Sequence, residues 1–287
     1  MVDYKNDYFE GERSLFAEHD ANIVNTVFGD GESPLKESYN ISLTNSIFKW
    51  KYPLWYSKHV HVDNTTFETM ARSGIWYTHD IQIENSILQA PKLFRRCTDI
   101  SLDHVFFADA EETLWNCDDV KMVHVQATGN YFGMNTDNCY LDHVNIVGNY
   151  CFDGSKNIEI HNSTFISKDA FWNCENVTIV DSTISGEYLG WNTKNLTLIN
   201  CTIESNQGLC YIDGLILKNC RLLRTDLAFE YCQNIDADIV SDVVSIKNPI
   251  SGVIKAHHVG EIILDATKVN PEDTRILTIN PNARVSK

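Results

Sequence analysis

The sequence lacks the long apolar run of a membrane helix, since no stretch approaches the roughly 18 apolar residues needed to cross a bilayer. Its start, MVDYKNDYFEGERSLF, has no basic region followed by an apolar segment, so we expect no secretory signal. Basic residues are also few: 23 stand against 39 acidic ones, and the formal net charge is -16. We therefore exclude a nucleic acid as the main partner, because binding such a polyanion needs a basic face.

What the sequence does contain is a repeat of about nineteen residues. DAFWNCENVTIVDSTI (169–184) returns nineteen residues later as YLGWNTKNLTLINCTI (188–203). Alignment of the repeated asparagine gives a first column in which every member tolerates a left-handed backbone: Asn22, Asn40, His59, Asp80, Asp99, Asp119, Asn138, Asn157, Asn176, Asn195, Gly214 and Asn234. Self-similarity at such a period is typical of a solenoid, and we interpret this column as a bend between strands, made once per coil.

A strand is expected after each of these bends. Apolar side chains alternate with polar ones there, as in Val177, Thr178 and Ile179, and alternation at period two is typical of a strand. Five residues after the first column comes a second one, which predicts a second bend: Asn45, Asn64, Asn85, His104, His124, His143, Asn162, Asp181, Asn200 and Asn219. Successive coils thus place like residues on like, about 4.8 Å apart.

These patterns predict an all-β chain that folds as a single-stranded right-handed parallel β-helix of about a dozen short coils. The sequence has neither the leucine pattern of a leucine-rich repeat nor the six-residue period of a left-handed β-helix. We expect residues 1–21 to form an N-terminal cap segment and residues 22–252 to form the β-helix. Residues 253–287 are expected to supply the last coil and a C-terminal cap or tail.

The cysteines lack the arrangement of a disulfide framework. There are nine of them, an odd number, and no two are spaced as Cys-x-x-Cys. A secreted disulfide scaffold normally has an even number in a shorter chain, so we expect reduced thiols in a cytoplasmic protein. This expectation includes Cys97 with Cys117 and Cys201 with Cys220, although each pair shares a column on adjacent coils.

The chain also resembles a known family. It is similar to the pectin-lyase-like superfamily of right-handed parallel β-helices and, within it, to a bacterial family of unknown function. The resemblance covers nearly the whole chain through FEGERSLF (9–16), GESPLKE (31–37), KYPLWY (51–56), ARSGIWYT (71–78), APKLFRRC (90–97), ETLWNC (112–117), GNYFGMN (129–135), FDGSKNIEI (152–160), SKDAFWNCENVTI (167–179), GEYLGWN (186–192) and TDLAFEY (225–231). The superfamily implies uronate-polysaccharide lyases, galacturonan hydrolases, pectin esterases or non-enzymatic members, and fold alone does not choose among them.

One side of each coil is not explained by stacking, because its residues differ from coil to coil. Five of the six tryptophans share one column four residues before the bend, and neighbouring columns mix tyrosines with charged side chains. Aromatic faces pack on sugar rings, while amides and charges bind hydroxyls and carboxylates, so we predict a groove for an oligosaccharide. Its expected binding residues are Arg72, Lys92, Arg95, Glu111, Trp115, Tyr131, Tyr150, Trp172, Glu187, Tyr188 and Trp191.

The sequence leaves open whether this groove is catalytic, and the candidates are Asp153, Asp169 and Lys168. The two aspartates belong to neighbouring coils and suit the paired carboxylates of a glycoside hydrolase. A polysaccharide lyase instead needs a base and a cation, which a lysine supplies. No cofactor is expected; Ca²⁺ is compatible with the acidic side chains but is not required by them.

Two motifs that look functional are better explained by the repeat. His104, His124 and His143 span about 9–10 Å along the axis, whereas zinc ligands lie about 2.0–2.1 Å from one centre. We therefore interpret these histidines as substitutes for asparagine and expect no metal site. NTD (135–137) resembles the Asn-Thr-Asp motif of galacturonan hydrolases, but the accompanying motifs are missing, and NTK (192–194) shows that the repeat generates the pattern.

Two functions remain open. In the first, a cytoplasmic β-helix protein binds or processes an oligosaccharide and, if it is an enzyme, resembles a polysaccharide lyase or a glycoside hydrolase. In the alternative, the protein is a non-enzymatic scaffold or protein-interaction module, and the varied columns are a solvated surface. The two hypotheses differ in one measurable respect, because the loss of a single carboxylate disables an enzyme and spares a scaffold. Neither involves a membrane or a nucleic acid.

Overall fold

The computed structural model describes residues 1–279 and 284–286, which fall into two compact units, Met1–Val147 and Gly148–Lys287. Both units consist of short strands paired in parallel, and no α-helix occurs in the described ranges. A long apolar helix able to cross a membrane is likewise absent from these ranges. The predicted fold class, an all-β right-handed parallel β-helix, is confirmed in each unit.

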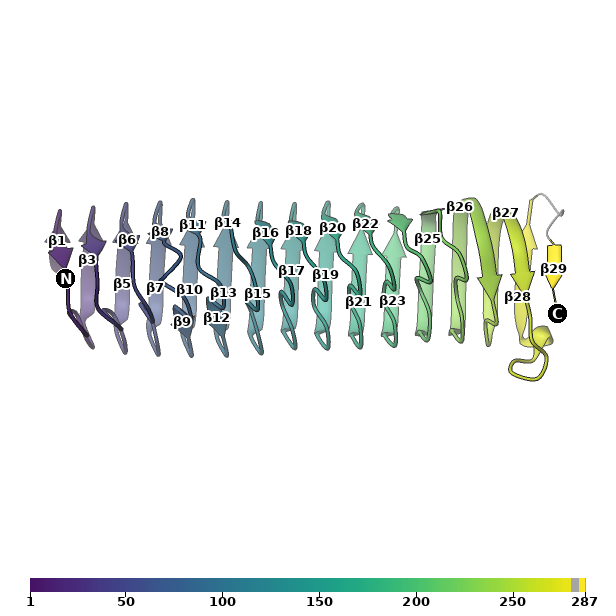
Figure 1. Ribbon diagram of the computed structural model, residues 1–287, viewed down its shortest axis with the longest axis horizontal. Coiled ribbons are helices and arrows are strands. Elements are labelled where there is room, and N and C mark those ends of the chain that lie inside the picture. The colour runs from purple at the N-terminus through teal and green to yellow at the C-terminus, as the bar shows by residue number, and fades with distance from the viewer. Residues whose placement is uncertain (280–283, 287) are drawn as a thin grey trace. The chain divides into compact units, whose positions relative to one another are not determined.

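In the first unit, one strand of each coil pairs in parallel with the same strand of the next coil (Figure 1). These strands are β1 (Val2–Lys5), β3 (His19–Val24), β5 (Tyr39–Thr44), β7 (Lys58–Asp63), β10 (His79–Glu84), β13 (Thr98–Asp103), β15 (Asp118–Val123) and β17 (Asp137–Asp142). Shorter strands follow them: β2 (Tyr8–Phe9), β4 (Val27–Phe28), β6 (Ile47–Phe48), β8 (Thr66–Phe67), β11 (Ile87–Leu88), β14 (Phe106–Phe107), β16 (Gln126–Thr128) and β18 (Asn145–Val147). A third short pair, β9 (Ile75–Trp76) with β12 (Phe94–Arg95), lies on the side of the tryptophan column.

The second unit repeats this arrangement with longer strands toward its end (Figure 1). Its main strands are β19 (Lys156–His161), β21 (Glu175–Val180), β23 (Lys194–Ile199), β25 (Asp213–Leu223), β26 (Gln233–Lys247), β27 (Gly252–Ile263) and β28 (Thr274–Thr278). Its short strands are β20 (Thr164–Ile166), β22 (Thr183–Ser185), β24 (Thr202–Glu204) and β29 (Arg284–Ser286). A 3₁₀ turn, η1 (Pro271–Asp273), precedes β28; Asn270 caps it by accepting a hydrogen bond from the Glu272 amide.

The first column is a left-handed position, as predicted, but it lies inside the main strand rather than between strands. All of its members from Asn40 to Asn234 have positive φ, and each is the second residue of its strand. The assignment of Asn22 to this column was wrong. Asn22 aligns with Ser42, while Asp20 has a φ of 52° and accepts a hydrogen bond of 2.9 Å from the Asn40 amide. The hydrogen bond between side chains of successive coils therefore identifies the first-column residue of a coil better than its residue type does.

The second column is confirmed as a bend that follows the main strand directly, except at Asn219, which lies inside β25. Its members from Asn45 to Asn219 all have positive φ. Their side chains form ladders between coils: the Asn64 amide donates to Asn45 over 2.6 Å, and Asn219 donates to Asn200 over 2.9 Å. Each ladder satisfies exposed polar groups while it fixes the register of neighbouring coils.

Inside the coils, residues of the same type also stack on one another from coil to coil. The rings of Phe28, Phe48 and Phe67 follow one another at centroid distances of 4.6 and 4.8 Å, and all three are buried. Buried hydroxyls form a second internal ladder, in which the Thr65 amide donates to the Ser86 hydroxyl over 3.0 Å. Apolar burial thus stabilises each coil through contact with its neighbours rather than through a core of its own.

The N-terminal segment, which was expected to be a cap, has the strand pairing of a coil. Within residues 1–21, Val2 pairs with Ala21 and Tyr8 pairs with Val27, so this segment is itself a coil. It has the ladder residue that a coil needs, because the Asn25 amide donates to Asn6 over 3.2 Å. Within residues 253–287, β27 pairs with both β26 and β28. The predicted C-terminal tail includes residues 280–283 and 287, which lie outside the described residues.

All nine cysteines are free and buried in the structure. Burial raises the pKa of Cys151 and that of Cys210, each to about 12. The thiolate is the reactive form, so both burial and protonation protect these side chains. We expect Ellman's reagent to modify all nine thiols in guanidinium chloride and almost none in native buffer. Rapid modification of the native protein would show instead that the coils open in solution.

Candidate functional site

In the second unit, a hollow of about 270 Å³ opens on the side that contains the tryptophan column. Its lining comes from three columns of the repeat and consists of Tyr150, Lys168, Asp169, Trp172, Tyr188, Trp191 and Gln207. All but Gln207 are residues that the sequence singled out as binding or catalytic candidates. The structure therefore brings this part of the predicted site together.

The backbone of the repeat positions these different side chains in equivalent places. Tyr150, Asp169, Tyr188 and Gln207 occupy one column, and each has a positive φ between 45° and 59°. Their amides bond to the next coil, as in Asp169 N–H to the Glu187 carbonyl at 2.8 Å. Because the main chain is tied in this way at every coil, the side chains project from rigid positions, which favours a preformed site.

The aromatic rings of the hollow contact one another at their edges and faces. The Tyr150 and Trp172 rings are nearly parallel, with centroids 6.1 Å apart and an interplanar angle of 25°. The Tyr188 and Trp191 rings meet edge to face at 5.0 Å. The Trp191 indole N–H donates to the Gln207 carbonyl over 2.6 Å, which fixes the orientation of this ring. Both tryptophans stay half-buried, so part of each indole surface faces solvent.

Lys168 provides a cation at the rim of the hollow. Its Nζ lies 3.6 Å from a Glu187 carboxylate oxygen and 5.2 Å from the centroid of the Tyr188 ring. The Lys168 side chain is 45% exposed, so water screens this ion pair and leaves the ammonium accessible to a ligand. Glu187 was predicted to bind substrate; the structure makes it the partner of Lys168 instead of a lining residue.

Asp169 is the buried acid of the hollow, with 5% of its surface exposed. Desolvation raises its pKa above the ordinary value, and the nearby Glu187 and Asp153 charges add to that rise. A hydrogen bond from Tyr150 and the Lys168 charge oppose the rise without cancelling it. A carboxyl with a raised pKa is a common feature of catalytic and binding sites, although ion networks also produce it.

Asp153 has a different environment from its predicted partner. Its carboxylate accepts a hydrogen bond of 3.1 Å from the Asn173 amide, and Asn173 in turn accepts one of 2.8 Å from Asn192. Asp153 thus begins an amide ladder beside the hollow and is not one of the lining residues. Gln207, by contrast, was not selected from the sequence; the available signal was its position in the column of Tyr188.

The candidates in the first unit form a stack of aromatic and charged side chains, in which the buried Arg95 Nε has no hydrogen-bond partner. The Arg95 guanidinium lies between two indoles, 4.7 Å from Trp76 and 4.6 Å from Trp115. Glu112 contacts Arg95 at 3.7 Å and Lys92 at 2.9 Å. Both neighbouring indoles thus contact a cation rather than presenting that face to a ligand.

The remaining candidates of the first unit surround this stack. Glu111 accepts a hydrogen bond of 2.9 Å from the Asn130 amide. The Trp115 indole donates to the Tyr131 carbonyl over 2.6 Å. Arg72 and Tyr131 are exposed. These contacts hold the side chains against the coils.

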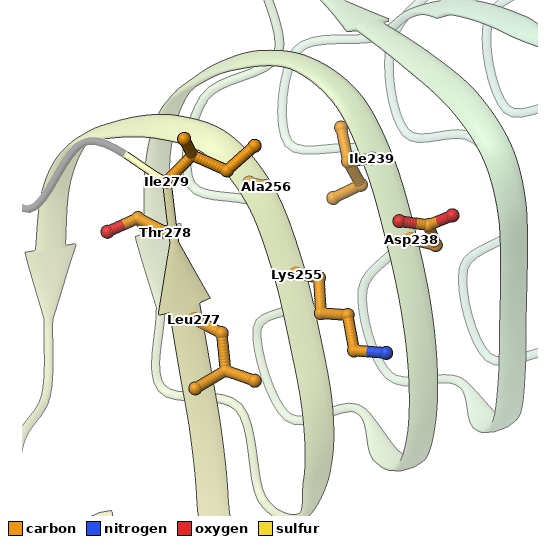
Figure 2. Close-up of a pocket in the computed structure, with 7 residues that line it drawn as sticks. All are labelled: Asp238, Ile239, Lys255, Ala256, Leu277, Thr278 and Ile279. Atoms are coloured by element: carbon orange, nitrogen blue, oxygen red, sulfur yellow. The ribbon is translucent and has the colours of Figure 1, made fainter.

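A further hollow, of about 280 Å³, lies on strands β26, β27 and β28 (Figure 2). The register aligns Asp238, Lys255 and Leu277 across these strands. Figure 2 shows the aliphatic chains of Leu277 and Ile279 on one side, with Lys255 and Asp238 on the other. The lining contains no aromatic ring, and we assign this hollow no part in sugar binding.

Comparison with known proteins places the chain by family and fold only. Residues 2–277 match the model of a family described as protein of unknown function (DUF3737). No curated protein matches the sequence.

Solved structures with a similar fold show low identity. PfbA, a surface adhesin of Streptococcus pneumoniae, is 12% identical over 80% of this chain and 71% of its own, with a TM-score of 0.36. The A-module of Azotobacter vinelandii mannuronan C-5 epimerase is 9% identical over 100% and 88%, with a TM-score of 0.30. The tailspike protein of E. coli bacteriophage HK620, in complex with a pentasaccharide, is 10% identical over 94% and 62%, with a TM-score of 0.34. Likenesses of this size say nothing about the ligand of this chain.

Replacement of Asp169 by Asn is expected to raise the thermal midpoint at neutral pH. Asn keeps the left-handed φ of 54° and accepts the Tyr150 hydrogen bond, while the cost of a buried charge disappears. The folded-state pKa lies above the ordinary 3.8, so wild-type stability falls as pH rises from 3.8 through the folded pKa. The advantage of the variant should therefore grow over that interval in a series of melting curves.

Asp20 provides a matched control with the opposite sign. Its φ is 52°, and hydrogen bonds from Asn40 and His19 lower its pKa. Asp20→Asn should therefore lose stability at neutral pH, and the deficit should close as pH falls through the lowered pKa. An Asp169→Asn protein that melts below wild type at neutral pH would contradict the inferred cost of burying this carboxyl.

Proposed function

We propose that this chain, which belongs to the family described as protein of unknown function (DUF3737), binds an oligosaccharide in the hollow of its second unit. The observation that carries the proposal is the convergence of four aromatic rings, one accessible cation and one buried carboxyl in a single space of about 270 Å³. Small-molecule sites have volumes of about 300–1,000 Å³. The hollow, at about 270 Å³, lies just below that range and suits one or a few sugar units of a longer chain.

Each group has a role in sugar recognition. The indoles of Trp172 and Trp191 provide apolar surface for the C–H face of a sugar ring. Since the Gln207 carbonyl already holds the Trp191 indole, little side-chain freedom is lost on binding. Asp169, together with the Tyr150 hydroxyl that bonds it, supplies hydrogen bonds for sugar hydroxyls.

Lys168 favours an acidic sugar such as a uronate within this class. The formal net charge of -16 opposes such a ligand at long range. That repulsion is screened over about 8 Å at physiological salt, whereas a carboxylate in contact with Lys168 is within a few ångströms. The local contact therefore outweighs the field of the whole chain.

The catalytic part of the proposal assigns Asp169 as the acid. A carboxyl whose pKa is raised retains its proton closer to neutral pH and can donate it to a leaving group. Asp153, at the head of its ladder, is the second carboxylate, and Lys168 stabilises negative charge on the substrate. Ca²⁺ is not needed in this scheme because Lys168 supplies the positive charge.

The binding test compares tryptophans from the same column. Trp172→Ala and Trp191→Ala should each weaken binding to a uronate oligosaccharide about tenfold, which corresponds to about 1.4 kcal/mol. Trp55→Ala is the control: it removes a tryptophan of that column in the first unit, where Trp55 stacks on Trp76 at 5.4 Å. Lys168→Met should weaken binding to acidic glycans and leave binding to neutral ones nearly unchanged. Isothermal titration against a glycan panel measures these differences.

Turnover of the same panel separates an enzyme from a binder. With an active parent, Asp169→Asn should abolish product formation and preserve most of the affinity. If the parent binds glycans but turns none of them over, its function is binding, and the acid–base roles proposed for Asp169 and Asp153 are wrong. If the folded parent binds no glycan on the panel, the carbohydrate proposal is wrong, and the non-enzymatic scaffold remains.

A further inference from the structure

Three metal-ligating side chains meet in the first unit, away from the tryptophan column. Asp103 ends strand β13, His104 follows it, and His124 occupies the same column on the next coil. One ligand atom from each of the three lies within 4.8 Å of the other two. The Asp103 carboxylate oxygen is 2.8 Å from His104 Nδ1 and 3.6 Å from His124 Nδ1.

Asp103 reaches the next coil as Asp63 does, whose carboxylate accepts a hydrogen bond of 2.8 Å from the Asn85 amide, but the coil after Asp103 has no acid of its own at this position. The register pairs Asp103 with Val123, so the coil of His124 has a valine where the coil of His104 has an acid. His143, one coil further, has its own acid again, since Asp142 lies 2.9 Å from its Nδ1. The Asp103 carboxylate consequently faces the imidazoles of two coils.

The cluster is open to solvent. The side chains of Asp103, His104 and His124 are 47%, 59% and 47% exposed. A hollow of about 310 Å³ adjoins the two imidazoles, and the exposed Gln126 also lines it. An ion with its bound water therefore has both access and space, and the carboxamide oxygen of Gln126 is a further oxygen donor at the same hollow.

We propose that Asp103, His104 and His124 bind a divalent transition-metal ion of the Zn²⁺ type. Two imidazole nitrogens and one carboxylate oxygen form the donor set of three-ligand zinc sites, which leave a fourth position for water. Bonds of 2.0–2.1 Å in a tetrahedron place ligand atoms about 3.4 Å apart. The Asp103–His104 separation of 2.8 Å is shorter than this value and the Asp103–His124 separation of 3.6 Å is slightly longer, so an ion requires small movements of these exposed side chains.

The proposal differs from the metal site that the sequence argues against. Three histidines on successive coils are spread over about 9–10 Å and cannot share one ion. The site proposed here needs only two adjacent coils, and its third ligand is Asp103 rather than His143. A bound ion would join the end of β13 to the residue that follows β15.

Isothermal titration of tag-free, chelator-treated protein with Zn²⁺ tests the proposal. We expect one ion per chain in the wild type. Asp103→Asn and His124→Asn should each weaken binding by at least about tenfold, since loss of groups that merely orient metal ligands costs 10–100-fold. Asparagine occupies the column of His124 in other coils, as at Asn85 and Asn162, so His124→Asn should fold normally.

A histidine of the other ladder provides the matched control. His59 lies 2.7 Å from Asp80 and belongs to no group of three metal-ligating side chains in the described part of the chain. His59→Asn should therefore leave Zn²⁺ affinity unchanged. Co²⁺ added in place of Zn²⁺ should give visible absorption typical of nitrogen and oxygen ligands, without a thiolate charge-transfer band.

Three results would overturn the proposal. The first is a wild-type protein that takes up no Zn²⁺. The second is affinity that stays within threefold of wild type in both Asp103→Asn and His124→Asn. The third is a thiolate band with Co²⁺, which would assign the metal to cysteines.

Discussion

Each coil of this protein obtains its hydrogen bonds from its neighbours, and the other features of the structure depend on that constraint. Main-chain amides donate across coils, as from Asn45 to Asp63 at 3.1 Å, and side chains then stack at the strand spacing of about 4.8 Å. The bends require many left-handed residues, each costing about 1–2 kcal/mol for an ordinary L-residue. Asn and Asp reduce this cost with ladder bonds. Bulky members offset it by stacking, as Tyr56 does on Tyr77 at 4.7 Å.

This constraint explains which parts of the fold could be predicted. Where the same residue type stacks on itself in successive coils, it recurs at a fixed spacing in the sequence. The second bend and the alternating strands were correctly located for this reason. A column is harder to align where the length of the repeat changes. Asp20 lies one repeat before Asn40 and is its ladder partner, but asparagine is the commoner residue in this column, so Asn22 was assigned to it instead. The first coil was interpreted as a cap because its ladder residue, Asn6, belongs to the second column and was not recognised there.

The candidate site was less predictable because stacking between unlike residues depends on the neighbour in the next coil. The sequence placed five tryptophans in one column and suggested one role for them. In the structure, Arg95 interrupts that column and contacts Trp76 and Trp115, while Trp172 and Trp191 line a hollow. The same limitation affected the histidines. Counting the histidines alone omitted Asp103, whose carboxylate contacts the imidazoles of two coils.

A solenoid of this kind separates the residues that build it from the residues that vary on it. Ladders and internal rings fix the backbone, so a side chain on the variable side changes little in its neighbours and can be selected for its chemistry. Asp169 differs from the ladder residues because it is buried and desolvation raises its pKa, so its charged form carries a cost to folding. A scaffold position would gain stability from an amide there, as Asn176 and Asn195 do in their ladder. Groups that oppose the stability of the fold are common in binding and catalytic sites, and this cost is the physical ground of the proposal made for Asp169.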